Sequence, residues 1–75
     1  MEHNPIAETI GFKIRERRAT TNIPRATLAR AVGVGYKSIW LWENGYGCPN
    51  IRYLCPLANA LDVTVDELLG NAHGS

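Results

Sequence analysis

Residues 28–45 read LARAVGVGYKSIWLWENG, and the fold of the 75-residue chain can be inferred outward from this segment. Apolar residues recur in it with the period of a helix on both sides of Gly33. Glycine accepts the left-handed conformation that ends many helices, so Gly33 predicts the end of one helix and a tight turn. The next helix is predicted to begin near Gly35 or Tyr36 and to run to about Glu43.

These two segments together have the pattern of a helix-turn-helix unit. Two helices that cross so closely need a small residue at the crossing, a glycine in the turn and apolar anchors on both sides. Ala29, Gly33, Val34 and Ile39 meet these requirements. Trp42 follows Ile39 by three residues, so both side chains are predicted to point inward.

The helix that opens this unit follows Ile23. Pro24 and Arg25 are predicted to begin it, since proline suits the start of a helix. Its buried face is predicted to consist of Leu28, Ala29 and Val32.

An earlier helix is predicted after Asn4, a good N-cap residue, with Pro5 in the first helical position. Ile6, Ile10 and Ile14 recur every four residues and form its apolar stripe. The run of two threonines and an asparagine before Ile23 ends it.

A fourth helix follows Asn50, a second candidate cap. Pro56 lacks a backbone donor, so the helix is predicted either to kink there or to become regular only near Cys55. Asp62 ends this helix. Its predicted apolar face consists of Leu54, Leu57, Ala58 and Leu61.

The last predicted helix is short and begins after Thr64, with Glu67 three residues later as its capping-box partner. Leu68 and Leu69 are expected to close the core. The chain is therefore predicted to be an all-α domain of five helices over residues 5–69, with residues 1–4 and 70–75 as flexible tails.

Composition excludes several classes of protein. Apolar residues make up 45% and charged residues 20% of the chain, values that argue against disorder. No apolar run approaches the length that crosses a bilayer, and the N-terminus lacks the pattern of a secretory signal. Cys48, expected to be exposed, and Cys55, expected to be buried, form no zinc pattern with the histidines. We therefore expect a cytoplasmic protein without metal, cofactor or membrane contact.

Charge is polarised along the chain although its net value is only +1. Residues 13–37 carry seven basic side chains and one acidic side chain, whereas residues 38–75 carry one basic and four acidic side chains. A basic stretch beside an acidic one is consistent with a face for a polyanion, or with a solvated helix face.

One family pattern extends over about residues 10–69. Its elements are Leu28-Ala29, Gly33-Val34, Ile39, Trp42-Glu43-Asn44-Gly45, Pro49, Leu57-Ala58, Ala60-Leu61, Val63-Thr64 and Asp66-Glu67-Leu68-Leu69. In this order they resemble the lambda-repressor and Cro-like (XRE-type) helix-turn-helix family. The resemblance implies a transcriptional regulator, most often a repressor, that binds double-stranded DNA as a homodimer on an inverted repeat.

The same resemblance implies roles for individual residues. The third helix would enter the major groove. The base-contact candidates are Tyr36, Lys37, Trp40 and Leu41. The phosphate-contact candidates are Arg25, Gly35, Ser38, Asn44 and Arg52. Arg18 would pair with Glu43, and Val65 and Glu67 are the dimerisation candidates.

The chain departs from the family pattern at several positions. Arg25 replaces a glutamine that usually contacts phosphate, and Gly35 replaces a serine or threonine. Trp40 and Leu41 stand where polar base-reading residues are common, and Arg17 stands where an apolar residue is common.

These departures leave alternatives open. The apolar third helix could bind a protein through Trp40 and Leu41, and antitoxins and restriction-control proteins share this fold and size. An enzyme is not expected, because no nucleophile with its base, carboxylate pair or phosphate-binding loop is present. No small-molecule substrate is indicated either.

Overall fold

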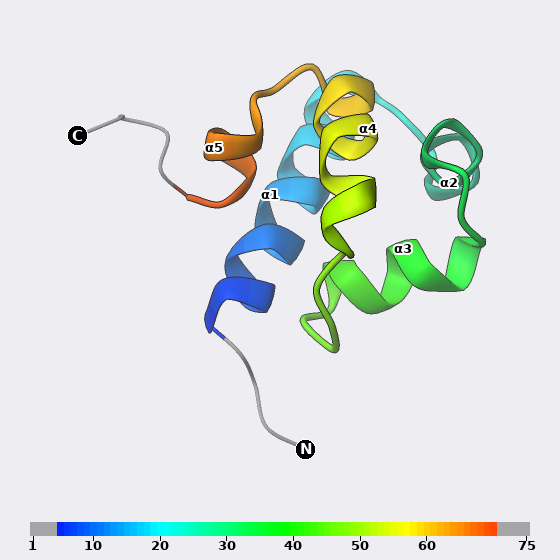
Figure 1. Ribbon diagram of the computed structural model, residues 1–75. Coiled ribbons are helices and arrows are strands. Elements are labelled where there is room, and N and C mark those ends of the chain that lie inside the picture. Colours follow the sequence, from blue (N-terminus) through cyan, green and yellow to red (C-terminus); the bar gives the residue numbers. More distant parts are fainter. Residues whose placement is uncertain (1–4, 71–75) are drawn as a thin grey trace.

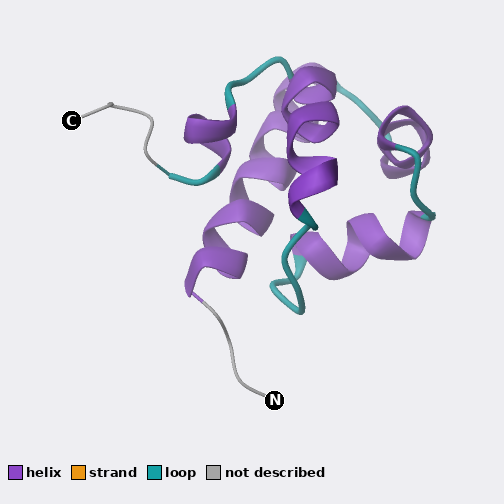
Figure 2. Ribbon diagram, in the orientation of Figure 1, coloured by secondary structure: helices purple, strands orange, loops and turns teal. Residues whose placement is uncertain are grey.

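The computed structural model describes residues 5–70, and these residues are helical apart from the connecting loops (Figure 1). The helices are α1 (Pro5–Thr21), α2 (Arg25–Val32), α3 (Tyr36–Glu43), α4 (Ile51–Leu61) and α5 (Val65–Leu68). Residues 5–70 contain no strand, as Figure 2 shows. The prediction of an all-α domain with five helices is confirmed. The predicted cap Asn4 and most of the two predicted tails lie outside the described residues.

All five helices share one hydrophobic core. Leu28 and Ile39 bring α2 and α3 into contact with α1 and α4, and Leu68 closes the core from α5. Burying one such side chain stabilises a fold by about 1.5–3 kcal/mol, so a handful of them hold this small domain together. The buried core residues are Ile10, Ile14, Leu28, Ala29, Val32, Ile39, Trp42, Leu57, Ala58, Leu61 and Leu68.

The turn between α2 and α3 has the geometry that its glycines predict. Gly33 has φ 90°, in the left-handed region, and its N–H donates to the Ala29 carbonyl. Gly35 is extended, with φ −80° and ψ 159°, and stands directly before α3. In Figure 1, α2 is seen nearly end-on while α3 runs across the view, so the two helices cross steeply.

The predicted caps of the last two helices are present. The Asn50 side chain accepts a hydrogen bond from the Arg52 N–H at 3.2 Å. Thr64 and Glu67 form a complete capping box at the start of α5. Asp62 ends α4 in the left-handed conformation, with φ 59°.

Three predictions about core positions are wrong or partly wrong. Ile6 is 58% exposed, because residues four apart drift around a 3.6-residue helix, and Ala7 takes the buried place one turn before Ile10. Cys55 is exposed because it lies outside the face that packs on the core. Leu54 is only half-buried.

Pro56 neither ends nor delays α4. The helix begins at Ile51 and continues through Pro56 to Leu61, so the predicted late start near Cys55 is wrong. Pro56 is in the middle of the 11-residue helix, and the bond it cannot make is the one to the Arg52 carbonyl in the first turn.

No helix in residues 5–70 combines the length and the apolar character that crossing a membrane requires. This finding concerns the helices of the described part of the chain alone.

A glycine that the sequence did not single out lets α1 and α3 touch. Gly11 lies buried in α1 against the backbone at the end of α3. A Cβ atom at this position would overlap the Trp42 carbonyl oxygen and lie 2.9 Å from the Glu43 carbonyl oxygen. Because both atoms belong to the backbone, α1 could not accept a side chain here without moving away from α3.

We therefore expect Gly11→Ala to destabilise the domain by about 1–3 kcal/mol, as overpacking does, despite the better helix propensity of alanine. Urea denaturation measures the difference. Gly47→Ala is the matched control, because no atom lies within 4 Å of a Cβ there. A Gly11→Ala protein as stable as the original chain would contradict the close packing of α1 on α3.

Candidate nucleic-acid interface

The outward side of α3 carries three of the four predicted base-contact residues. Tyr36 is 53% exposed, Trp40 is 39% exposed, and Lys37 is also exposed. These positions lie on one side of the helix, while Ile39 and Trp42 are buried on the other. Leu41 is half-buried, so the fourth candidate contributes only part of its side chain to this face.

Lys37 is available to a partner. Its side chain forms no hydrogen bond or ion pair with the residues that the structure describes. An ammonium on the first turn of an exposed helix can donate to guanine O6 and N7 in the major groove.

Trp40 does not stand alone on the surface. Its ring stacks on Tyr46, with the ring centroids 5.9 Å apart and the planes 18° from parallel. Tyr46 follows α3 in the loop and is 51% exposed. The stack covers one face of the indole and holds Trp40 in place, while the remaining surface stays open.

Four of the five predicted phosphate-contact residues lie around α3 and the start of α4. Gly35 precedes α3, and the Ser38 N–H donates to the Gly35 carbonyl at 3.1 Å. Asn44 donates from Nδ2 to the Trp40 carbonyl at 2.8 Å, so one of its two amide hydrogens is used at the end of α3 and the other remains for a ligand. Arg52 is exposed in the first turn of α4.

A buried carboxylate lies behind this surface. The Glu43 side chain is fully buried at the end of α3 and pairs with Arg18 of α1. Arg18 donates from Nε to Oε2 at 2.5 Å and from Nη2 to Oε1 at 3.2 Å. The pair that the family resemblance implies is therefore present.

Arg25 also binds Glu43, which the sequence did not predict. Its Nε donates to Oε1 at 2.8 Å, and its Nη1 donates to the Tyr36 hydroxyl at 3.3 Å. The hydrogen bond to Glu43 raises the pKa of Arg25, so the guanidinium stays charged. Arg25 was predicted only as a phosphate contact, yet it also joins α2 to α3.

Two guanidinium groups thus share one carboxylate and leave one positive charge in excess. Arg18 and Arg25 keep 20% and 30% of their side chains exposed. An arginine has five N–H donors, and Arg25 uses two of them within the described residues. Donors therefore remain for an anion that approaches the start of α2.

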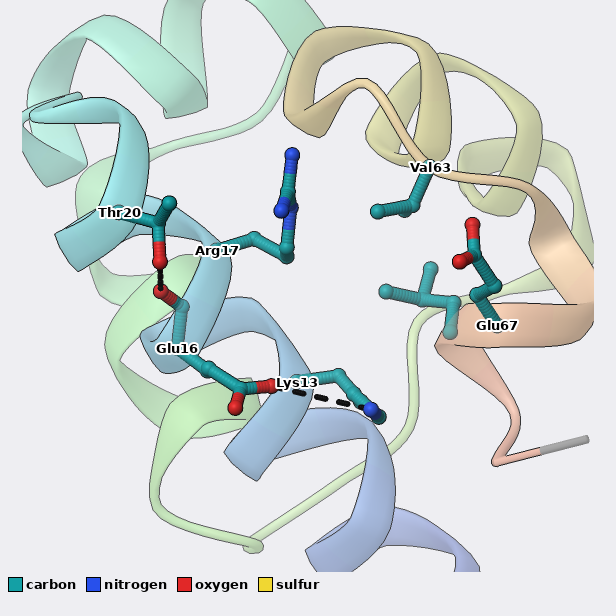
Figure 3. A pocket seen from close by; sticks show the side chains of 7 residues that line it. Lys13, Glu16, Arg17, Thr20, Val63 and Glu67 are labelled. Atoms are coloured by element: carbon teal, nitrogen blue, oxygen red, sulfur yellow. Dashed lines mark hydrogen bonds and ion pairs between the residues drawn. The ribbon is translucent and has the colours of Figure 1, made fainter. Parts of the chain in front are cut away.

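The dimerisation candidates lie away from this surface, beside a separate pocket of about 230 Å³ between α1 and α5 (Figure 3). Val65 is half-buried in α5, and Glu67 lines the pocket while its carboxylate completes the capping box. Arg17 lines the pocket too and donates to the Leu61 carbonyl at 3.3 Å. Arg17, at a position that is usually apolar in the family, therefore provides a hydrogen-bond donor for the last carbonyl of α4.

We find no candidate metal site in the part of the chain that the structure describes. Residues 5–70 contain no group of three His, Cys, Asp or Glu side chains placed to hold an ion. Both cysteines are free and exposed.

The geometry around Glu43 predicts unequal effects of its two arginines on stability. Arg18→Met removes two hydrogen bonds from a buried charge, and we expect it to destabilise the domain by about 2–3 kcal/mol. Arg25→Met removes one and leaves Arg18 in place, so about 1 kcal/mol is expected.

Chemical denaturation of both variants tests this order, with Arg15→Met as the control for loss of an exposed arginine on α1. If all three variants are equally stable, the carboxylate does not hold the helices together.

Comparison with known proteins agrees with this geometry. Residues 14–68 match the family described as Helix-turn-helix. The chain is 36% identical over 63 residues to the cryptic phage CTXphi transcriptional repressor RstR of Vibrio cholerae, a match that covers 79% of this chain and 56% of that protein. The chain thus spans little more than half the length of that relative.

Two solved structures have the same fold. The P22 c2 repressor in complex with a synthetic operator superposes with a TM-score of 0.79 at 37% identity, over 83% of this chain and 94% of that one. The restriction-modification controller protein C.AhdI of Aeromonas hydrophila superposes with a TM-score of 0.76 at 27% identity, over 83% and 94%.

These relatives are regulators, in agreement with the prediction that the chain is not an enzyme. Because the family model matches most of its length, the chain belongs to the lambda-repressor-like, XRE-type helix-turn-helix family of transcriptional regulators.

Proposed function

We propose that this protein binds a specific double-stranded DNA operator as a homodimer and represses transcription by occluding it. The observation that carries the proposal is the exposed side of α3, where Tyr36, Lys37 and Trp40 project together from a helix fixed at its other end. The P22 c2 repressor, which shares the fold, has been solved with an operator. We further propose that the protein acts in the cytoplasm.

In this proposal the first turns of α3 read base edges in the major groove. Lys37 donates to guanine, and Trp40 packs its open surface against thymine methyl groups. The Tyr36 hydroxyl accepts from Arg25, so its own proton is left to donate to an acceptor on the DNA. Leu41 adds apolar contact with the part of its side chain that remains exposed.

Phosphate contacts orient α3 in the groove. Arg25 offers its remaining donors at the start of α2, and Gly35 places the backbone N–H groups of α3 against the strand. Ser38, Asn44 and Arg52 complete the set. If a dimer neutralises about six phosphates, the logarithm of its affinity falls with the logarithm of salt concentration at a slope near −5.

The dimer would form through the α5 side of the domain, where Val65 and Glu67 lie. Because α5 packs on α1 and α4, a dimer formed there leaves both copies of α3 uncovered (Figure 1). Two α3 helices related by a two-fold axis read half-sites about one helical turn apart.

A restriction-control function is the second candidate. The observation that favours it is the shared fold with C.AhdI, the controller protein of a restriction-modification system. Both functions use the same DNA-binding surface, and they differ only in which genes the operator controls.

Selection of bound duplexes from a randomised pool at moderate salt tests the proposal. Enrichment of an inverted repeat, with half-sites about one helical turn apart, is the expected result. A pool that stays random after repeated selection would contradict sequence-specific binding. That result would favour the alternative in which Trp40 and Leu41 contact a protein partner.

Lys37→Ala is expected to relax base preference at one position of each half-site, with a loss of discrimination of about 1–3 kcal/mol there. Arg52→Ala is expected to weaken all duplexes alike and to make the salt slope shallower. Binding isotherms on the selected operator and on its single-base variants separate the two effects. Equal weakening of every duplex by Lys37→Ala would remove it from the base-contact set.

Trp40 provides an optical test of where the DNA lies. In a Trp42→Phe variant Trp40 is the only tryptophan, and acrylamide should quench it less once the operator is bound. In the matching Trp40→Phe variant, the buried Trp42 should show the same quenching with and without DNA. Unchanged quenching of Trp40 in a saturated complex would show that the DNA does not cover α3.

A further inference from the structure

A second basic surface adjoins the proposed interface. An open groove of about 520 Å³ lies along α1 and reaches the start of α2. The groove is lined by Phe12, Arg15, Glu16, Arg18, Ala19 and Arg25, and we refer to it as the arginine groove.

The charge of the arginine groove is positive. Three of its six lining residues are arginines, and the carboxylate of Glu16 lies 3.7 Å from the ammonium of Lys13, which offsets its charge. The Glu43 carboxylate beneath Arg18 and Arg25 is fully buried and balances only one of them. A ligand that enters this groove therefore meets a surface that attracts anions.

Arg15 is the member of the groove with all of its donors unused. Its exposed side chain forms no hydrogen bond or ion pair with residues 5–70. Arg18 and Arg25, by contrast, are held by Glu43. Arg18 donates from all three guanidinium nitrogens within the domain, to Glu43 and to the Ile23 carbonyl. The free Arg15 and the unused donors of Arg25 therefore offer two positions at which phosphates can be bound.

The groove is continuous with the DNA surface because Arg25 belongs to both. A strand whose phosphate meets Arg25 at the start of α2 continues along α1 if it follows the lining of the groove. Phe12, which is 61% exposed, and Ala19 would then supply an apolar wall beside the sugars. This continuity favours the backbone of the same DNA molecule over an unrelated acidic peptide.

We propose that the arginine groove binds the sugar-phosphate backbone of DNA flanking the half-site, with Arg15 as its main contact. The inference rests on the proposed DNA binding and extends it from the helix-turn-helix unit to α1. It assigns the protein a footprint longer than the bases that α3 reads.

The test compares two duplexes built on the inverted repeat recovered by selection. One ends at the two half-sites, and the other extends about one helical turn beyond each of them. The original protein should bind the extended duplex more tightly. Arg15→Ala should lose about threefold to tenfold in affinity on the extended duplex, with a salt slope shallower by about two per dimer, and little on the short one.

Arg30→Ala is the matched control, because Arg30 is an exposed arginine of α2 outside the groove. An equal loss with Arg30→Ala would mean that general charge, not the groove, attracts the DNA. Equal affinity of Arg15→Ala and the original protein for the extended duplex would overturn the groove proposal while DNA binding itself stands. Absence of binding to both duplexes by the original protein would overturn the proposed function and the groove together.

Discussion

The arrangement of the first three helices depends on one buried carboxylate. Glu43 ends α3 inside the domain, where Arg18 of α1 and Arg25 of α2 both donate to it. An unpaired charge in this position would be strongly destabilising, so the three helices are stable only when they meet there. Gly11 permits the same meeting, because it lets the α1 backbone reach the last carbonyls of α3.

A helix fixed at one end can present the other end in a constant orientation. The buried end of α3 contains Trp42 and Glu43, whereas its exposed start carries Tyr36 and Lys37. Arg25 connects the two regions, since it binds the buried Glu43 with Nε and the exposed Tyr36 with Nη1. Fold stability and the geometry of the proposed DNA contacts are therefore coupled through one side chain.

Local sequence patterns predict the helices and turns of this fold. They do not predict the contacts between helices, which depend on long-range packing. Gly33 marked the turn correctly because its left-handed conformation is a property of the residue itself. The four-residue spacing of the isoleucines wrongly predicts that Ile6 is buried, because a four-residue repeat drifts off the buried face of a helix. The roles of Gly11 and Arg25 depend on distances between helices, which no periodicity within one helix contains. For Gly11, the sequence offers one signal, which is the presence of a glycine in the middle of a predicted helix.

In the proposed complex, DNA lies against α3 and the start of α2. Titration of the isotopically labelled protein with the selected operator, followed by amide chemical shifts, locates the contact directly. The largest changes are predicted at Arg25 and in residues 35–41, with smaller changes along α1 and none concentrated in α5. Saturable binding with the largest changes in α4 and α5 instead would contradict the assignment of α3 as the DNA-reading helix.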